Sequence, residues 1–537
     1  MRFDERYPTI PVMVRHSAER FGDRSYLLDE DQEWSFAEAE LRMVEAARAF
    51  VALGIAPRDR VVILGPNSAG WIHAALGIYA AGGIVVPVNT RFKGHEIAHV
   101  LERSGASAIV TVGGFLGVDY VGMIREAAPE SPALSKVVIL DDVPVPGTIA
   151  FTDFLAAGAG VPEGVIADRI SGIGYEDASD IIFTSGTTGA PKGVPLRHGT
   201  TLRSYHFLLG AFTITEADTH AIVPPFFHTF GSKTGWLGGL ITGARIIPLR
   251  TFDSATLMET IERHRVSVIC GPPTVFIDMI ADPRRPDFDL SSLRAAVPGS
   301  AGAPVTLVHD MHDVLGFEVV LNAYGLTEAH SIVATCLPSD PPEIIAGTVG
   351  RAIDDVEVVI ADDDGLPVAN GTPGEILVRG YTVMDGYWDD PAATARAIDA
   401  DGFLHTGDVG TVDDQGYLRV TDRKKDMFIV GGFNAYPAEI ESVLMRHDGI
   451  QHVAVIGVPD ERMGEVGWAY VVPAPGSGID EQEVIAYARG NLANYKVPRR
   501  VVLVDELPRN ATSKVLKFVL RERAAELRRA ESDAARS

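Results

Sequence analysis

The segment DIIFTSGTTGAPKG at residues 180–193 is an apolar strand pattern that leads into a run of glycines and hydroxyl side chains. Glycines let successive backbone amides converge on an anion, hydroxyl groups supply further donors, and Lys192 adds a positive charge. We therefore predict a phosphate-binding loop. It is not a Walker A loop, because Pro191 and Val194 stand where a second glycine would follow Gly186 or Gly189.

Four further segments combine glycines, aromatic rings, hydroxyl groups, carboxylates or a histidine in short motifs. NAYGLTEA at 322–329 combines an aromatic ring, a hydroxyl group and a carboxylate, and carboxylate oxygen is a preferred ligand of hard cations. VPGSAGAP at 297–304 is a glycine-rich turn, and HTGDVG at 405–410 contains a carboxylate. PPFFHTFG at 224–231 holds His228 between aromatic residues, a setting in which a histidine is more often a core residue than a functional one.

Two C-terminal segments combine charges with turn residues. DRKKDMFIVGGFNAYPAEIE at 422–441 begins with a basic cluster, which by itself would be read as a solvated charge run. LPRNATSK at 507–514 ends on Lys514, a cation able to stabilise negative charge that develops on a reacting group.

Together these segments resemble the signatures of the adenylate-forming superfamily, which includes acyl-CoA synthetases, nonribosomal adenylation domains and beetle luciferases. The resemblance covers nearly the whole chain, and the motifs occur in family order. It implies a two-step reaction: a carboxylate attacks the α-phosphorus of Mg·ATP to give acyl-adenylate and pyrophosphate, and the CoA thiolate then attacks the adenylate. ATP, Mg²⁺ and coenzyme A are the expected cofactor and co-substrates, and a small carboxylic acid is the expected partner.

The resemblance also implies residue roles. Catalytic roles fall on Lys514, Lys192, His228 and Glu328, and magnesium binding on Thr184 and Glu328. Tyr324 would stack on adenine, Thr327 would contact the α-phosphate, and Asp408 and Arg423 would hold the ribose. The implied ATP/AMP-binding set is Thr184, Ser185, Gly186, Thr187, Thr188, Gly189, Lys192, Gly299, Ser300, Ala301, Asn322, Ala323, Tyr324, Gly325, Thr327, Asp408, Arg423 and Lys514. The implied CoA channel contains Gly431 and Gly432, the acyl pocket Phe227, His228, Gly231 and Gly325, and the hinge Lys425.

One position departs from the family pattern. Ser513 stands where a glycine usually precedes the catalytic lysine, and serine tolerates fewer backbone conformations. Lys514 is the preferred catalytic lysine, and Lys517 is the weaker substitute.

The acid is expected to lack an amino group, because Lys233 is the only charge in residues 226–239 and no acidic side chain is there for a substrate ammonium. The glycines of this segment could leave room for a broad apolar body, although glycines also allow close packing. MFIVGGFNAYPAEIE resembles ligases that act on propanoate-bearing remnants of steroid rings, which we prefer to medium-chain fatty acids. A carrier-loading adenylation enzyme, a luciferase-like monooxygenase and a catalytically dead binding module are the alternatives.

The elements that position these residues are predicted to form an α/β fold. Apolar runs at 60–67, 83–88, 107–112, 244–249, 267–270 and 318–325 alternate with helical patterns such as 36–54, as in parallel sheets with crossover helices. After Ala352 shorter strands and turns predict a β-rich subdomain. We expect an N-terminal AMP-binding domain over 1–421, a hinge at 422–426 and a small mobile α+β domain over 427–537, whose last 17 residues form a solvated, fraying helix.

Composition narrows the function classes. The 537 residues are 46% hydrophobic and 22% charged, as in globular proteins, and the net charge of −25 disfavours nucleic acid as a partner. The two cysteines exclude a disulfide framework, and Asp4 and Glu5 stand where a signal peptide would be basic, so we expect a cytoplasmic protein. The uncharged stretch 71–88 is read as a buried helix and strand rather than a membrane span. The sequence leaves a homodimer open.

Overall fold

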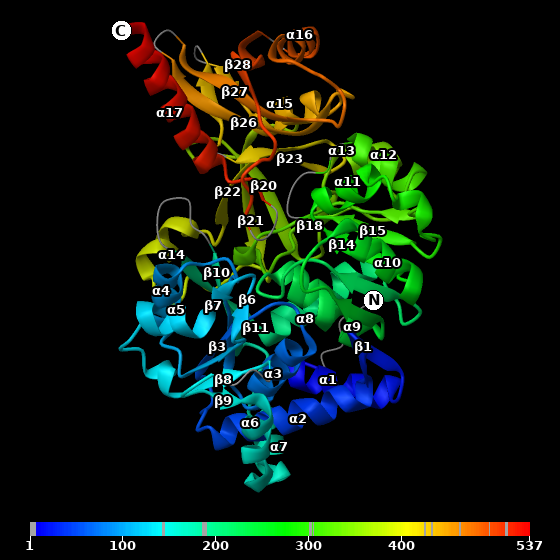
Figure 1. Ribbon diagram of the computed structural model, residues 1–537, viewed down its shortest axis with the longest axis vertical. Helices are drawn as coiled ribbons and strands as arrows, with labels where there is room; N and C mark the ends of the chain where they lie inside the picture. The colour runs from blue at the N-terminus through cyan, green and yellow to red at the C-terminus, as the bar shows by residue number, and fades with distance from the viewer. Residues whose placement is uncertain are drawn as a thin grey trace.

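The computed structural model describes residues 7–141, 145–184, 191–299, 303, 305–423, 426–430, 433–460, 463–492, 494–510 and 514–536, with backbone alone at 422–423, 433–434 and 530–536. The seventeen α-helices of this part of the chain cover and connect six sheets (Figure 1). They are α1 Ile10–Phe21, α2 Phe36–Ala52, α3 Ala69–Ala80, α4 Gly94–Ser104, α5 Tyr120–Ala127, α6 Phe151–Ala157, α7 Glu163–Ser171, α8 His198–Ala211, α9 Gly238–Thr242, α10 Ser254–His264, α11 Pro273–Ala281, α12 Val305–Asp313, α13 Pro342–Gly347, α14 Pro391–Ala397, α15 Pro437–Leu444, α16 Glu481–Asn491 and α17 Lys517–Arg536.

One seven-stranded sheet carries the strand that leads to the predicted phosphate loop. Its order is β11 (Lys192–Arg197), β10 (Ala178–Thr184), β4 (Ile84–Pro87), β3 (Arg60–Leu64), β5 (Ala108–Thr111), β8 (Val137–Ile139) and β9 (Ile149–Ala150). All its neighbours are parallel except the antiparallel pair β10 and β11. The predicted strands at 60–67, 83–88 and 107–112 are confirmed, and residues 71–88 form most of buried α3 and the strand β4, as predicted.

A second seven-stranded sheet has the order β16 (Val319–Val320), β15 (Ala295–Pro298), β14 (Val268–Gly271), β12 (Thr219–Ile222), β13 (Arg245–Pro248), β1 (Ser25–Asp29) and β2 (Gln32–Ser35). The largest hydrophobic core takes residues from both sheets and from α1, α2, α3, α8 and α9. Two smaller cores lie on the outer faces, one beneath α4 and α5 and the other beneath α10, α11 and α12. The N-terminal part is therefore layered helix, sheet, helix, sheet, helix.

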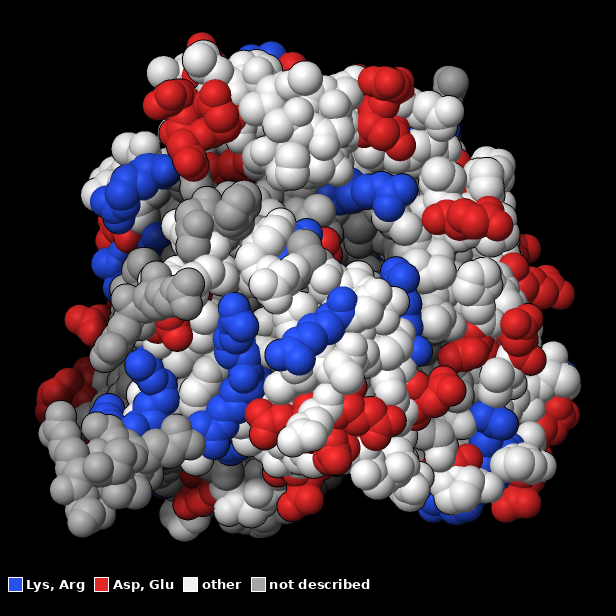
Figure 2. Space-filling view, turned by 90° about the horizontal axis from the view of Figure 1, so that it is seen from above, with Lys and Arg blue, Asp and Glu red and all other residues white. Residues whose placement is uncertain are grey.

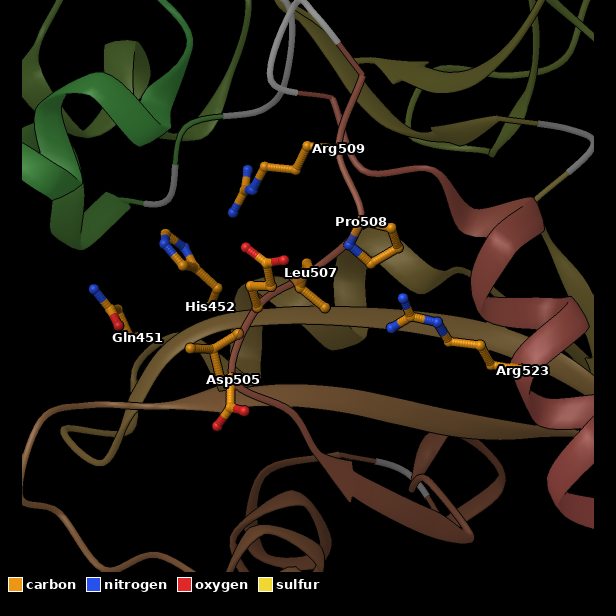
Figure 3. Close-up of a pocket in the computed structure, with 9 residues that line it drawn as sticks. Gln451, His452, Asp505, Leu507, Pro508, Arg509 and Arg523 are labelled. Carbon is orange, nitrogen blue, oxygen red and sulfur yellow. The ribbon is translucent and has the colours of Figure 1, made fainter. Parts of the chain in front are cut away.

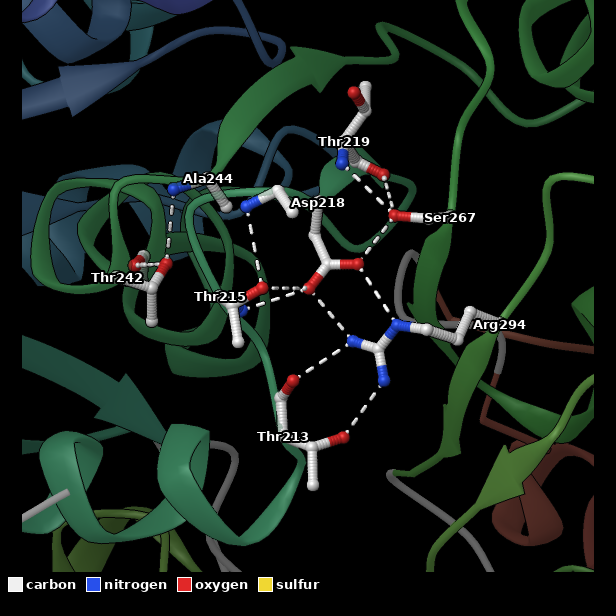
Figure 4. Close-up of polar contacts among 10 residues, drawn as sticks. Thr213, Thr215, Asp218, Thr219, Thr242, Ala244, Ser267 and Arg294 are labelled. Carbon is white, nitrogen blue, oxygen red and sulfur yellow. Dashed lines mark hydrogen bonds and ion pairs between the residues drawn. The ribbon is translucent and has the colours of Figure 1, made fainter.

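A polar cluster ties together the beginnings of strands in the second sheet (Figure 4). Arg294, directly before β15, donates to both carboxylate oxygens of Asp218, at 3.1 Å to Oδ1 and 2.8 Å to Oδ2. Ser267, directly before β14, donates to Asp218 at 2.8 Å, and the Thr215 amide donates to it at 2.9 Å. Arg294 also bonds the hydroxyl group and the carbonyl of Thr213, so one ion pair fixes the loop after α8 against two strands.

The predicted β-rich region after Ala352 is a four-stranded antiparallel sheet of β20 (Val356–Ala361), β21 (Gly374–Gly380), β22 (Leu404–Val412) and β23 (Leu418–Arg423). A three-stranded sheet of β17 (Ala323–Tyr324), β18 (Ala334–Thr335) and β19 (Arg351–Ala352) precedes it. The prediction of one strand over 318–325 is wrong, because β16 and β17 belong to different sheets. This break turns the NAYGLTEA segment away from the second sheet.

The C-terminal part is an α+β unit with its own sheet, formed by β25 (Phe433–Ala435), β24 (Phe428–Val430), β27 (Gly464–Pro473) and β26 (Ile450–Asp460), with β28 (Arg500–Leu503) parallel to β27. The remaining sheet, which lies in the N-terminal part, has only the two strands β6 (Gly114–Phe115) and β7 (Val118–Asp119). The prediction of a solvated helix over the last 17 residues is wrong for the start of that segment, because Ala524 is buried against the C-terminal sheet and Leu527 packs on the same core. No helix among the described residues is long and apolar enough to cross a membrane.

Candidate active site

The ends of the predicted phosphate loop are held together by a strand pair. Thr184, the last residue of β10, is the antiparallel partner of Lys192, the first residue of β11. The ammonium group of Lys192 lies 4.8 Å from the centre of the Tyr387 ring. The loop residues Ser185, Gly186, Thr187, Thr188 and Gly189 lie outside the described residues.

Glu328 joins this strand pair to a second segment. It lies in a short 3₁₀ turn, Thr327–Ala329, and its Oε1 accepts hydrogen bonds from the Thr184 hydroxyl at 3.3 Å and the Tyr387 hydroxyl at 3.1 Å. Burial and the Glu328 carboxylate raise the pKa of Tyr387, so its hydroxyl group stays protonated and donates. Three predicted residues, Thr184, Lys192 and Glu328, thus meet around Tyr387. Tyr387 was not predicted, because no motif marks it in the sequence.

Two residues predicted for the nucleoside also meet. The Tyr324 hydroxyl donates to Asp408 Oδ2 at 2.6 Å, although 84 residues separate them in sequence. Asp408 lies in β22 and is 3% exposed, and its backbone is the antiparallel partner of Arg423 in β23. Sheet pairing therefore brings both predicted ribose contacts to the same place in the β-rich region. The Arg423 side chain lies outside the described residues.

His228 lies at a turn where the acyl and C-terminal segments meet. Its Nδ1 accepts the Phe230 amide at 3.2 Å, so an Nε2–H tautomer satisfies this bond. Burial, together with the nearby positive charge of Lys514, lowers the pKa of His228 to about 4. The imidazole is therefore neutral at physiological pH. The structure brings Lys514 toward His228 although these residues come from different domains of the predicted organisation.

The glycines near His228 are used for close packing. A Cβ atom at Gly231 would lie 2.3 Å from the carbonyl oxygens of Pro224 and Pro225, and one at Gly235 would lie 2.8 Å from Ile222. A Cβ atom at Gly299 would lie 2.8 Å from the Phe230 ring, and Phe227 is itself buried. The sequence left open whether the glycines of residues 226–239 make room for a broad acid or allow close packing. The structure favours close packing.

Lys233, the only charge of residues 226–239, is a core residue. It lies in a π-helix, Phe230–Leu237, is fully buried, and its ammonium contacts Asp180 Oδ2 at 2.7 Å. Asp180 also accepts from the Tyr79 hydroxyl at 2.7 Å and from the Ser179 hydroxyl at 2.6 Å. The pair connects β10, which leads to the phosphate loop, with the helix that follows His228. Its sequence signal was the lone charge in an apolar segment.

The remaining predicted residues divide into two groups. Asn322 is 7% exposed and donates to the Ile345 carbonyl at 2.6 Å, so its side chain stabilises the surrounding loop. Ala323 is half-buried and Thr327 is buried beside Glu328, and a Cβ atom at Gly325 would lie 2.1 Å from the Ser331 carbonyl oxygen. The predicted residues that lie outside the described part are Ser300, Ala301, Lys425, Gly431 and Gly432, in addition to the phosphate-loop residues.

The described residues contain no group of three or more His, Cys, Asp or Glu side chains able to hold a metal ion. The oxygen atoms of Thr184 and Glu328, 3.3 Å apart, do fit the hard-cation chemistry predicted for them. Cys270 and Cys336 are buried and free, in agreement with the expected absence of a disulfide framework.

Comparison with known proteins identifies the family. The model of the AMP-binding enzyme family matches residues 14–388, and that of the AMP-binding enzyme C-terminal domain matches 439–514. A 3-[(3aS,4S,7aS)-7a-methyl-1,5-dioxo-octahydro-1H-inden-4-yl]propanoyl:CoA ligase of Mycobacterium tuberculosis is 48% identical over 514 residues, covering 96% of this chain and 98% of that protein. The ligase of the same name from Rhodococcus jostii is 44% identical, with 96% and 99% coverage. A medium-chain acyl-CoA ligase of Macaca fascicularis is 33% identical, with 96% and 87% coverage.

Solved structures agree with this result. The anthranilate CoA ligase AuaEII in complex with anthranoyl-AMP superposes with a TM-score of 0.87 at 25% identity, covering 96% of this chain and 97% of that chain. ATP-bound MatB from Rhodopseudomonas palustris gives a TM-score of 0.81 at 28% identity, with 96% and 98% coverage. The fold and the sequence therefore point the same way: the chain belongs to the AMP-binding enzyme family, in its AMP-forming acyl-CoA synthetase branch.

Proposed function

We propose that the protein converts a propanoate carried on a fused-ring, steroid-derived skeleton into its CoA thioester, with release of AMP and pyrophosphate. The observation that carries this proposal is the identity of 48% and 44%, over 96% of the chain, to two ligases whose printed names specify such an acid. The lower identity of 33% to a medium-chain ligase ranks a simple fatty acid second.

In the first step the acid carboxylate attacks the α-phosphorus of ATP, and pyrophosphate leaves. Lys192 and the loop that it closes bind the phosphates, while Tyr324 and Asp408, joined at 2.6 Å, position the nucleoside. Lys514 neutralises the charge that grows on the α-phosphate and the carboxylate. Positioning and electrostatic stabilisation supply most of the rate in such a transfer.

Thr184 and Glu328 are the residues that would hold Mg²⁺, because both present oxygen atoms beside the phosphate loop. The ion would neutralise phosphate charge during transfer. Tyr387 donates to the same Glu328 oxygen and so holds the carboxylate toward Thr184 and Lys192.

In the second step the CoA thiolate attacks the acyl carbon, and AMP leaves. A neutral His228 suits the junction of acyl pocket and thioester tunnel that the family resemblance implies, because it places no extra positive charge beside Lys514. Several expectations from the sequence stay predictions. They are the channel residues Gly431 and Gly432, the pivot Lys425, the domain limits 1–421, 422–426 and 427–537, the cytoplasmic location and a homodimer.

The test is CoA-dependent AMP release across a panel of acids: the dioxo-octahydroindenyl propanoate, octanoate, benzoate and phenylalanine. We expect the ring-bearing propanoate to give the highest kcat/KM and a thioester product. Preference for octanoate would overturn the acid assignment alone. Formation of adenylate without thioester would favour an enzyme that loads a carrier protein, and light emission in the presence of oxygen would favour a luciferase-like reaction. A lack of activity on every acid would overturn the ligase proposal.

A further inference from the structure

Lys514 belongs to a small hairpin whose two sides are joined by backbone contacts. Arg509 and Val515 form an antiparallel bridge, and the Asn510 amide donates to the Lys514 carbonyl at 2.8 Å. The Leu516 amide donates to the Pro508 carbonyl at 2.8 Å, and the Lys514 amide donates to Asn510 Oδ1 at 2.8 Å. Arg509 and Lys514 are therefore fixed to each other, and whatever holds Arg509 also positions Lys514.

Arg509 lines a pocket of about 570 Å³ at the edge of the C-terminal sheet, together with His452 of β26. Figure 3 shows the side chains of Arg509 and His452 on the same side of this pocket, toward the green helices of the N-terminal part. His452 Nε2 lies 3.8 Å from Asp278 Oδ1, a residue of α11 in the N-terminal part. The pocket itself is lined by residues of the C-terminal part, and His452 in its wall lies beside Asp278 of the N-terminal part.

The charges where the hairpin and α11 approach each other are complementary. Burial raises the pKa of Asp278, and the positive charge of Arg509 opposes that shift. Burial, together with the positive charge of Arg509, lowers the pKa of His452 to about 4, so its imidazole is neutral at working pH. Arg509 therefore supplies the positive charge that faces Asp278, and His452 packs beside the carboxylate as a neutral ring.

Asp278 stands on a rigid support. Its helix α11 follows β14 directly, and Val275, Phe276 and Met279 of the same helix are buried in the core beneath it. The Asp278 side chain is 39% exposed, so residues of the C-terminal part can approach its carboxylate and move away from it without disturbing that core. A fixed acidic side chain on one domain thus lies beside His452 of the other and within the electrostatic influence of Arg509 on the hairpin.

We propose that Asp278 is a positioning residue that docks Arg509 and His452 and thereby holds the Lys514 hairpin over the adenylation site. The contact must break when the C-terminal domain pivots for thioester formation, so it favours the first half-reaction only. This inference rests on the proposed two-step function, and its test must separate the two half-reactions.

The decisive variant is Asp278→Asn, with Asp287→Asn as the matched control at an exposed acid shortly after the same helix. Pyrophosphate release reports adenylation, and thioester formation from supplied acyl-adenylate and CoA reports the second step. We expect Asp278→Asn to slow adenylation about tenfold and to change thioester formation less than about twofold. The charge-reversed pair D278R/R509D should regain much of the adenylation rate that either single reversal loses.

A distance readout tests the contact without any acid. Spin labels at E259C on α10 and E483C on α16, both exposed, report the arrangement of the two domains. We expect Asp278→Asn to broaden or lengthen the distance distribution and Asp287→Asn to leave it unchanged. Equal loss in both half-reactions, no rescue by the reversed pair, or an unchanged distribution in Asp278→Asn would overturn the proposal. A wild-type enzyme inactive on every acid would overturn only the ligase function.

Discussion

Lys514 is the residue whose predicted role can be tested most directly. It approaches the neutral His228, whereas Lys517 is held by Glu441 at 2.8 Å and cannot replace it without breaking that pair. We expect Lys514→Ala to slow adenylation at least about 100-fold, the size of effect seen when a transition-state donor is removed, and to spare thioester formation from supplied adenylate. Lys517→Ala is the control, with little effect on pyrophosphate release. Equal losses in both half-reactions would refute the role of Lys514.

The Lys233–Asp180 pair should be costly to break because both side chains are buried. Lys233→Met would leave the Asp180 carboxylate without its cation, and removing one partner of a buried pair costs about 3–5 kcal/mol. We expect a lower thermal midpoint for Lys233→Met, and a smaller loss for the double variant K233M/D180N than the sum of the single losses. Arg263→Met removes an exposed charge and serves as control. Additive losses would show that the two residues are not coupled.

Several site residues could be predicted from sequence because their segments resemble the family's motifs and their types suit the chemistry. Thr184, Lys192 and Glu328 were predicted from separate motifs, and the structure gathers them. Tyr387 could not be predicted, since its contact with Glu328 depends on how the chain after β21 folds back. The roles of Gly231 and Lys233 were equally hidden, because a glycine in sequence does not reveal which carbonyl presses against it, nor a lysine its buried partner.

Among the elements, the strand ends tied by Asp218 and Arg294 make a measurable contribution to stability. Burial alone would raise the pKa of Asp218, but bonds from Arg294, the Thr215 amide and Ser267 together lower it below its usual value. A carboxylate with a lowered folded-state pKa stabilises the fold above its unfolded pKa, and this stabilisation is lost as the pH falls through the folded pKa.

We therefore expect Asp218→Asn to lower the thermal midpoint at pH 7, through the loss of about 3 kcal/mol from a largely buried pair. The difference from wild type should shrink as the pH falls below the ordinary carboxyl range, where the wild-type Asp218 also becomes neutral. Thermal unfolding from pH 7 to pH 3 measures this, with Asp287→Asn at an exposed position outside the cluster as the control. A difference that stays constant with pH would mean that packing, rather than charge, explains the loss.

Elements of regular pattern could be predicted, and those set by tertiary contacts could not. The parallel strands at 60–67, 83–88 and 107–112 are continuous β-branched runs that only a doubly covered sheet accommodates, and each is a strand. Residues 318–325 read as one strand, yet the chain passes from one sheet to another within them. The charged final helix looked solvated, but a stripe containing Leu520 and Ala524 is enough to pack it on the C-terminal sheet.

At the scale of the whole molecule, the net charge of −25 is unevenly divided. Residues 422–537 contain 17 basic and 17 acidic residues, so the remaining 30 basic and 55 acidic residues place the whole excess before the hinge. Figure 2, which looks onto the end of the molecule where the C-terminal part lies, shows Lys and Arg side chains interspersed with Asp and Glu side chains. The long-range field of the N-terminal body therefore repels an anionic nucleotide, and binding must rely on groups in direct contact with it.

This division predicts an unusual response of ATP binding to salt. Screening weakens the repulsion between distant charges more than it weakens contacts with Lys192 or backbone amides, because the Debye length falls from about 20 Å near 20 mM salt to about 8 Å near 150 mM. We expect the KM for Mg·ATP to stay level or fall over that range at constant magnesium. Lys192→Gln should raise KM at both salt concentrations, since it removes a local donor. A KM that rises steeply with salt in the wild type would instead mean that long-range attraction recruits the nucleotide, and the acidic body would then have to be overcome by a basic surface on the C-terminal domain.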